Sequence, residues 1–64
     1  MVIYIDELET IRIQEIDDDD IYSPIGVYDE TIKGEGNLLK TFPTGKIEEA
    51  IRFGEEYHKK KNGV

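Results

Sequence analysis

The sequence contains no cysteine, so the chain forms no disulfide and no zinc site built on thiolates. It contains one histidine, His58, which excludes a metal site with several imidazole ligands. No apolar run approaches the roughly 20 residues that span a bilayer. The first six residues lack the basic region and the long apolar region of a secretory signal. We therefore expect a cytoplasmic protein without a cofactor.

The length of 64 residues predicts a single domain that covers 1–64. A domain this small is only marginally stable alone, and such domains often gain stability from disulfides, a metal or a partner subunit. Because disulfides are excluded, a second copy of the chain is one way to complete the fold. A homodimer is therefore one expectation.

The net charge of −7 is unevenly distributed along the chain. Residues 1–32 carry ten acidic side chains and one basic one, whereas residues 33–64 carry five acidic and seven basic ones. An acidic front half is repelled by phosphate backbones and by membrane surfaces, and it is attracted to basic protein surfaces. The charge therefore predicts a protein partner and disfavours direct binding of nucleic acid or membrane.

The first half of the chain predicts strands. Residues 2–5 are β-branched and aromatic, and residues 10–16 alternate around Ile11 and Ile13, as in a half-buried strand. The intervening 7–9 is either a hairpin turn or part of one longer bent strand, because it contains neither Gly nor Asn.

The middle of the chain predicts a further hairpin. Strand character resumes at residues 25–28, with a continuation to residue 32 left open. Residues 34–37 form a turn in which Gly34 and Gly36 are free to adopt positive φ. Residues 38–42 then predict the returning strand, which Pro43 ends.

The end of the chain predicts a helix with Thr44 or Gly45 as N-cap; with Gly45 at the cap, Glu48 is the third helical residue. Residues at three- and four-residue spacing form one apolar face: Ile47, Ala50, Ile51, Gly54 and Tyr57, with Phe53 at its edge. Gly54 within that face predicts close approach of the helix to the sheet. We also expect ion pairs between residues four apart, Glu48–Arg52, Glu55–Lys59 and Glu56–Lys60.

These elements predict an α+β fold in which a three- or four-stranded antiparallel β-meander carries one C-terminal α-helix on one face. Residues 62–63, Asn-Gly, are expected to cap the end of that helix. The other face of the sheet is left to water or to a partner, as antiparallel sheets allow.

The most unusual feature is a run of four aspartates at 17–20, which has three open interpretations: a solvated loop, a surface that docks on a basic partner, or a loose Mg²⁺ or Ca²⁺ site. An EF-hand loop starting at Asp17 is excluded, because Tyr22 and Tyr28 stand where glycine and glutamate are required. Tyr22 follows the run and is a candidate interface anchor.

Acidic residues spaced by two along a strand project about 6.6 Å apart on one face and can imitate a row of phosphates. Glu7 with Glu9 and Glu15 with Asp17 have that spacing. We therefore expect that the chain can compete with nucleic acid for a DNA-binding protein.

Catalysis is not expected. A Ser–His site would require Ser23, the one serine, to meet His58, which is better explained as a residue of the last helical turn.

The function predicted is that of a small non-catalytic protein whose acidic half binds a basic protein surface, such as a phage-type inhibitor of a nucleic-acid-handling enzyme. The alternative is a homodimeric structural or assembly protein with no electrostatic target. The candidate partner-binding residues are Glu7, Glu9, Glu15, Asp17, Asp18, Asp19, Asp20 and Tyr22. No catalytic or metal-ligating residues are assigned.

Overall fold

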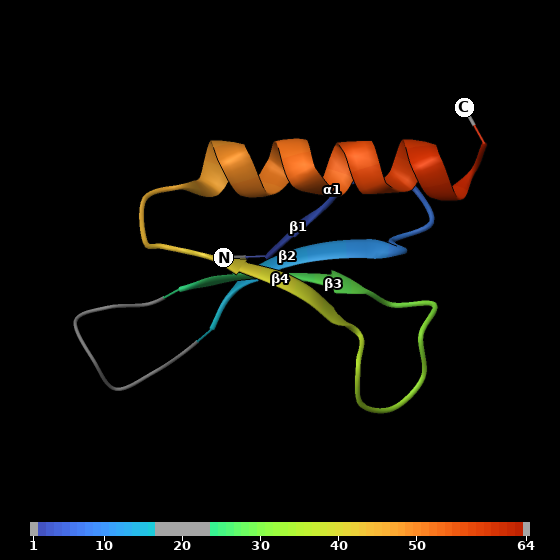
Figure 1. The fold of residues 1–64 in the computed structure, drawn as a ribbon, viewed down its shortest axis with the longest axis horizontal. Helices are drawn as coiled ribbons and strands as arrows, with labels where there is room; N and C mark the ends of the chain where they lie inside the picture. Colours follow the sequence, from blue (N-terminus) through green and yellow to red (C-terminus); the bar gives the residue numbers. More distant parts are fainter. Residues whose placement is uncertain (1, 17–23, 64) are drawn as a thin grey trace.

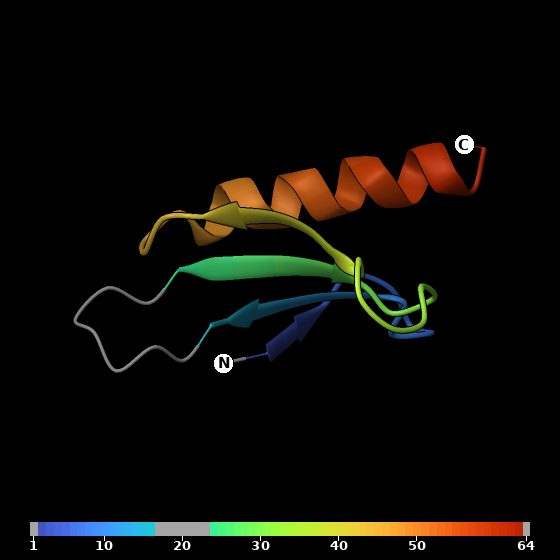
Figure 2. The same ribbon diagram turned by 60° about the horizontal axis from the view of Figure 1, so that its bottom comes forward.

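A computed structural model describes residues 2–16 and 24–63. Its elements are β1 (Val2–Tyr4), β2 (Ile11–Glu15), β3 (Ile25–Asp29), β4 (Leu38–Phe42) and α1 (Ile47–Lys61). The strands form one antiparallel sheet in the order β1-β2-β3-β4, and α1 lies across one face of it (Figure 1 and Figure 2). The predicted α+β meander is therefore confirmed, with four strands.

The first hairpin settles the alternatives for residues 7–9, which form a turn and do not continue a bent strand. The carboxylate of Asp6 closes this turn, because it accepts hydrogen bonds from the backbone N–H and the hydroxyl of Thr10 at 2.7 and 2.6 Å. Glu9 takes the left-handed conformation, with φ of 57°. The hydrogen bonds to Asp6 thus stabilise a hairpin turn that lacks the Gly or Asn usually found in such turns.

β3 is shorter than the longest prediction. It ends at Asp29, after which Ile32 N–H donates to the carbonyl of Asp29 at 3.2 Å and closes a turn. Gly34 and Gly36 have φ of 81° and 99°, as the turn required. β4 has the predicted bounds.

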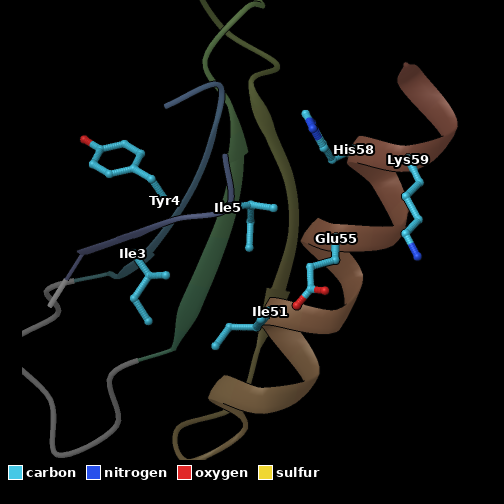
Figure 3. Close-up of a pocket in the computed structure, with 7 residues that line it drawn as sticks. All are labelled: Ile3, Tyr4, Ile5, Ile51, Glu55, His58 and Lys59. Carbon is cyan, nitrogen blue, oxygen red and sulfur yellow. The ribbon is translucent and has the colours of Figure 1, made fainter. Parts of the chain in front are cut away.

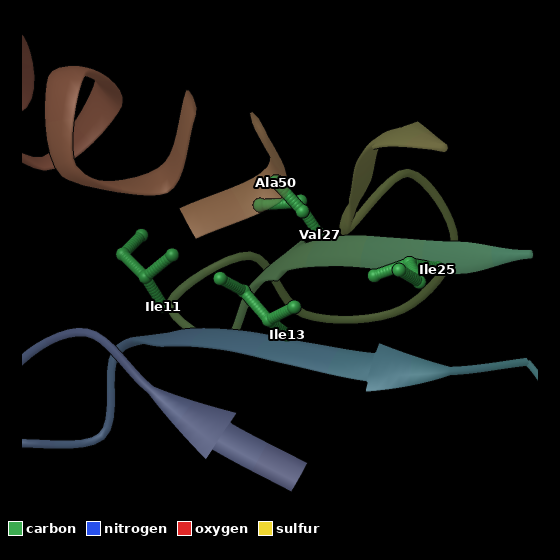
Figure 4. Close-up of a cluster of buried hydrophobic side chains, with 5 residues drawn as sticks. All are labelled: Ile11, Ile13, Ile25, Val27 and Ala50. Atoms are coloured by element: carbon green, nitrogen blue, oxygen red, sulfur yellow. The ribbon is translucent and has the colours of Figure 1, made fainter. Parts of the chain in front are cut away.

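The core lies between the sheet and α1. Its buried apolar side chains are Ile11, Ile13, Ile25, Val27 and Ala50 (Figure 4). A Cβ built on Gly54 would lie 3.0 Å from Cγ1 of Ile5 and 3.3 Å from Cγ2 of Ile11. The predicted close approach at Gly54 is therefore confirmed: the helix packs so closely on the first hairpin that a side chain at this position would require its neighbours to shift.

The ends of α1 differ in how well they were predicted. The N-cap is Lys46, without a side-chain capping hydrogen bond, so the prediction of Thr44 or Gly45 is wrong and Glu48 becomes the second helical residue. Gly45 instead takes φ of 87° in the preceding turn. The C-cap is Asn62, as predicted, and its N–H donates to the carbonyl of His58 at 3.1 Å.

The expected ion pairs along α1 do not form. In the part of the chain that the structure describes, the two ion pairs are Arg12–Glu30 and Lys61–Asp29, and neither joins residues of one helical turn. The exposed glutamates and lysines of the helix face solvent, where such pairs gain little.

The face of the sheet opposite α1 has its own packing. The ring of Tyr28 lies across Gly26, where a Cβ would come within 2.8 Å of Cε1 of the ring. The guanidinium of Arg12 stacks on the same ring, 4.4 Å from its centroid. The Tyr28 ring therefore covers Gly26, and the cation–π contact with Arg12 holds the ring in place.

Candidate partner-binding surface

The structure divides the predicted partner-binding residues between two ends of the sheet. Glu15 is the last residue of β2 and pairs with Ile25, the first residue of β3. Ile25 pairs in turn with Phe42, the last residue of β4, and α1 begins five residues later. The end of β2 and the start of α1 therefore share one end of the molecule, which both ribbon views show (Figures 1 and 2).

Three exposed carboxylates are carried at this end, by Glu15 and by Glu48 and Glu49 in the first turn of α1. None of the three takes part in an ion pair within the described residues. We call these three residues the acidic end. Asp17–Asp20 and Tyr22 follow Glu15 in the sequence and lie outside the described residues.

Glu7 and Glu9 lie at the opposite end, in the turn before β2, and both are exposed. The expectation that they alternate along a strand is wrong, because residues 7–9 form the turn. They therefore do not have the 6.6 Å strand spacing that would imitate phosphates. The structure does not bring them together with Glu15.

Three other acidic residues of the front half are engaged within the protein. Asp6 closes the first turn. Glu30 Oε1 lies 3.2 Å from Nε of Arg12, close enough for an ion pair, although the angle is not that of a hydrogen bond. Asp29 is fully buried. The net charge of residues 1–32 is therefore more negative than the charge that these residues expose to a partner.

Asp29 is the centre of a group that the sequence did not reveal. Its Oδ1 accepts hydrogen bonds from the N–H and the hydroxyl of Thr31, at 2.9 and 2.5 Å. Its Oδ2 accepts one from the hydroxyl of Tyr57 at 2.6 Å and one from Nζ of Lys61 at 2.8 Å. Lys61 also donates to the hydroxyl of Thr31. We call these four residues, Asp29, Thr31, Tyr57 and Lys61, the Asp29 cluster.

The cluster changes the ionisation of its members. Burial raises the pKa of Asp29, but hydrogen bonds from Lys61, Thr31 and Tyr57 outweigh it and hold that pKa well below its usual range. The pKa of Tyr57 is raised because its hydroxyl donates to Asp29, with burial and the nearby negative charge acting in the same direction. Asp29 is thus ionised and neutralised internally, and it ties the end of β3 to the last turn of α1.

Asp6 is a milder case of the same effect. The hydrogen bond from the Thr10 hydroxyl lowers the pKa of Asp6 against a smaller opposing effect of burial, and the N–H groups of Thr10 and Ile11 and the charge of His58 add to the lowering. The sequence could have indicated a turn at this point, since aspartate side chains commonly accept hydrogen bonds from the backbone of the turn that follows them. Nothing local in the sequence links Asp29 to Lys61, which is 32 residues away.

His58 belongs to the last turns of α1, as predicted. The amide nitrogen of Asn62 lies 3.0 Å from Nδ1 of His58 and also donates to its carbonyl at 2.8 Å. Ser23 lies outside the described residues. Within residues 2–16 and 24–63, no three acidic, His or Cys side chains gather as metal ligands.

A groove of about 340 Å³ separates β1 from α1 (Figure 3). Its apolar lining consists of Ile3, Ile5 and Ile51, and Glu55, His58 and Lys59 of α1 also line it. Tyr4 borders it from β1, with its ring directed away from the helix.

The described part of the chain contains no helix with the length and apolarity needed to cross a membrane. No protein-family model, curated protein or solved structure matches this chain.

Proposed function

We propose that this is a non-catalytic binding protein whose acidic end docks on a basic surface of another protein. The observation that carries the proposal is that Glu15, Glu48 and Glu49 are exposed at one end of the molecule and form no ion pair with any described residue, whereas Asp29 and Glu30 are neutralised within the fold. Unpaired charges of one sign at one end of a small molecule give an oriented field that steers association.

The two ends are not equivalent as docking surfaces. Glu7 and Glu9 share their end with the basic last turn of α1, which consists of His58, Lys59, Lys60 and Lys61. The three lysines reduce the negative potential of Glu7 and Glu9. For the residues of the acidic end, the bases nearest in the sequence are Lys46, the N-cap of α1, and Arg12, which pairs with Glu30. The sequence also attaches Asp17–Asp20 two residues after Glu15, which favours the acidic end further.

A protein whose basic surface normally binds nucleic acid has the required positive charge. In this proposal the chain therefore acts as an inhibitor of an enzyme that handles nucleic acid. The imitation of a phosphate row does not extend to Glu7 and Glu9, which lack strand geometry, and Asp17 of the other predicted pair lies outside the described residues.

The test begins with capture of partners from cell extract by the tagged full chain at low salt, followed by affinity measurements on the purified partner. Affinity is expected to fall steeply as salt rises above about 0.1 M, since exposed charges are screened beyond about 10 Å there. The triple variant Glu15→Gln, Glu48→Gln, Glu49→Gln should bind at least about tenfold more weakly. The control Glu7→Gln, Glu9→Gln removes two carboxylates that are also exposed and should bind within about threefold of the wild type.

A second variant that replaces all four residues of 17–20 with Asn measures the contribution of the aspartate run. Equal losses for the control and the triple variant, or an affinity that does not change with salt, would contradict the proposal. Capture of a partner through an apolar surface would contradict it as well.

A further inference from the structure

The two edges of the sheet are protected to different degrees. β4 carries Lys40, is irregular because of a register shift opposite Val27 and Tyr28, and is followed by Pro43. Charged side chains, bulges and proline are the features by which natural sheets prevent another strand from pairing with an edge. The β4 edge is therefore protected against strand addition.

β1 is short, with three residues, but its edge lacks a charged side chain, a bulge and a proline. Residues 2–5 contain no charged residue and no proline. Val2 and Tyr4 are 47% and 43% exposed, and Leu8 in the following turn is 83% exposed. Of the five large apolar side chains that are exposed in the described residues, three therefore belong to the first eight residues. Such a strand invites another strand to pair with it.

The backbone of β1 is oriented for such pairing. Ile5 N–H donates to the carbonyl of Ile11 at 3.0 Å, so Ile5 and, two residues earlier, Ile3 are the positions that bond to β2. In an antiparallel pair the bonding positions alternate. The N–H and C=O groups of Val2 and Tyr4 therefore point away from β2, towards the open edge.

The groove beside β1 provides space for the side chains of an added strand. It has a volume of about 340 Å³ and an apolar floor formed by Ile3, Ile5 and Ile51. Glu55 and Lys59 on its rim have opposite charges. On a chain with a net charge of −7, the β1 edge is thus a surface whose own charges compensate one another.

We propose that a second copy of this chain pairs with β1, antiparallel and about a two-fold axis at Ile3, so that two sheets join into one of eight strands. Chains of charge −7 repel each other, so self-association requires a surface without net negative charge, which the β1 edge supplies. In this register Val2 and Tyr4 of each copy exchange backbone hydrogen bonds with Tyr4 and Val2 of the other, and the two Ile3 side chains meet beside the grooves. The contact is self-complementary, as a two-fold interface must be.

The pairing gives this small domain a larger common core and covers its least protected edge. It does not depend on the partner proposed for the acidic end, and it is tested without that partner.

Sedimentation equilibrium of the full chain over a range from micromolar to millimolar should show a monomer–dimer equilibrium. Tyr4→Lys places a charge on the unprotected edge and should weaken dimerisation by at least about tenfold. Leu38→Lys is the matched control, because Leu38 is equally exposed at 42% and lies on the other edge strand. It should change the dimerisation constant by less than about threefold. A monomer at all concentrations, or equal losses for both variants, would overturn the proposal.

Cysteine cross-linking keeps the test independent of dimer strength. The chain has no cysteine of its own, so Ile3→Cys introduces a single thiol. Residues that face each other in a non-hydrogen-bonded antiparallel pair have Cα atoms about 4.5 Å apart, which a disulfide can bridge. Mild oxidation should convert Ile3→Cys to a covalent dimer much faster than Leu38→Cys. Faster cross-linking of Leu38→Cys would place the interface on β4, and equal rates would show random collision; either result would contradict pairing through β1.

Discussion

Asp6 and Asp29, at one end of this sheet, have a role opposite to that of the carboxylates at the acidic end. At the end where β2 begins and β3 finishes, Asp6 closes a turn and Asp29 anchors the last turn of the helix. At the acidic end, Glu15 and its two neighbours on α1 face solvent. The difference arises from the direction of α1, whose basic C-terminal turn reaches the first end and whose acidic first turn lies at the second.

The comparison teaches that net charge does not measure the charge available to a partner. An aspartate and a glutamate count equally in the sequence, yet Asp29 is enclosed by two hydroxyl groups and an ammonium group, and Glu15 has no ion pair in the described residues. Two results would contradict this distinction. The Asp29 cluster would contribute nothing to the free energy of unfolding, or the acidic end would contribute as much as the cluster.

The largest effect is expected for Lys61→Met, which leaves the buried carboxylate of Asp29 without its cation. Removal of one partner of a buried ion pair typically costs about 3–5 kcal/mol. Because the Lys61 side chain is 39% exposed and Asp29 keeps its hydrogen bonds from Thr31 and Tyr57, we expect a loss of about 2 kcal/mol in the free energy of unfolding. Urea denaturation measures it.

Lys60→Met is the control for this variant, since Lys60 is exposed, adjacent in sequence and not bonded to Asp29. Its free energy of unfolding should stay within about 0.5 kcal/mol of the wild type. Equal losses for the two variants would show that removal of helix-end charge, and not the Asp29 cluster, is responsible.

Titration of the Asp29 cluster should lower the free energy of unfolding at both acidic and alkaline pH. The pKa of Asp29 is lower in the folded state than its ordinary value of 3.8, so its contribution is fully present above that value and is lost as pH falls through the folded-state pKa. The pKa of Tyr57 is raised above its ordinary value of 10.0, so its contribution is present below pH 10 and is lost as pH rises through the folded-state pKa.

Free energies of unfolding measured from pH 7 down to pH 2 should therefore fall for the wild type, and the fall should be smaller in Asp29→Asn, which lacks the titrating group. A residual fall is expected in that variant because the pKa of Asp6 is also lowered. If the two proteins lose the same free energy of unfolding between pH 7 and pH 2, Asp29 does not contribute to the loss of stability in acid. Tyr57→Phe tests the alkaline limb in the same way.

Most of the fold could be predicted from the sequence, because local patterns determine it. Alternation at Ile11 and Ile13 gave β2, the glycines at 34 and 36 gave the turn before β4, and the helical spacing of Ala50 and Gly54 gave the buried stripe of α1. The N-cap was mispredicted because Gly45 was needed for its positive φ in the preceding turn.

The candidate site was harder to predict because it depends on which residues meet across the fold. Glu7 and Glu9 were assigned to the same partner-binding surface as Glu15, but the hairpin places them at the other end of β2. Asp29 was counted among the acidic residues of the front half without a separate role, and the antiparallel register sets it opposite Ile11, on the side covered by α1. A one-residue change of register would have turned the same carboxylate to the open face.

The smallest effect on stability is expected at the acidic end, and Glu15 tests it best. Glu48 and Glu49 lie in the first turn of α1, where each carboxylate gains about 0.3–1 kcal/mol from the helix dipole, so neutralising them changes stability for a reason unrelated to a partner. Glu15 ends a strand and has no such contribution. Glu15→Gln should therefore alter the free energy of unfolding by less than about 0.5 kcal/mol, as measured by urea denaturation beside Lys61→Met. A loss comparable to that of Lys61→Met would show that Glu15 serves the fold, and the distinction between the two ends would then disappear.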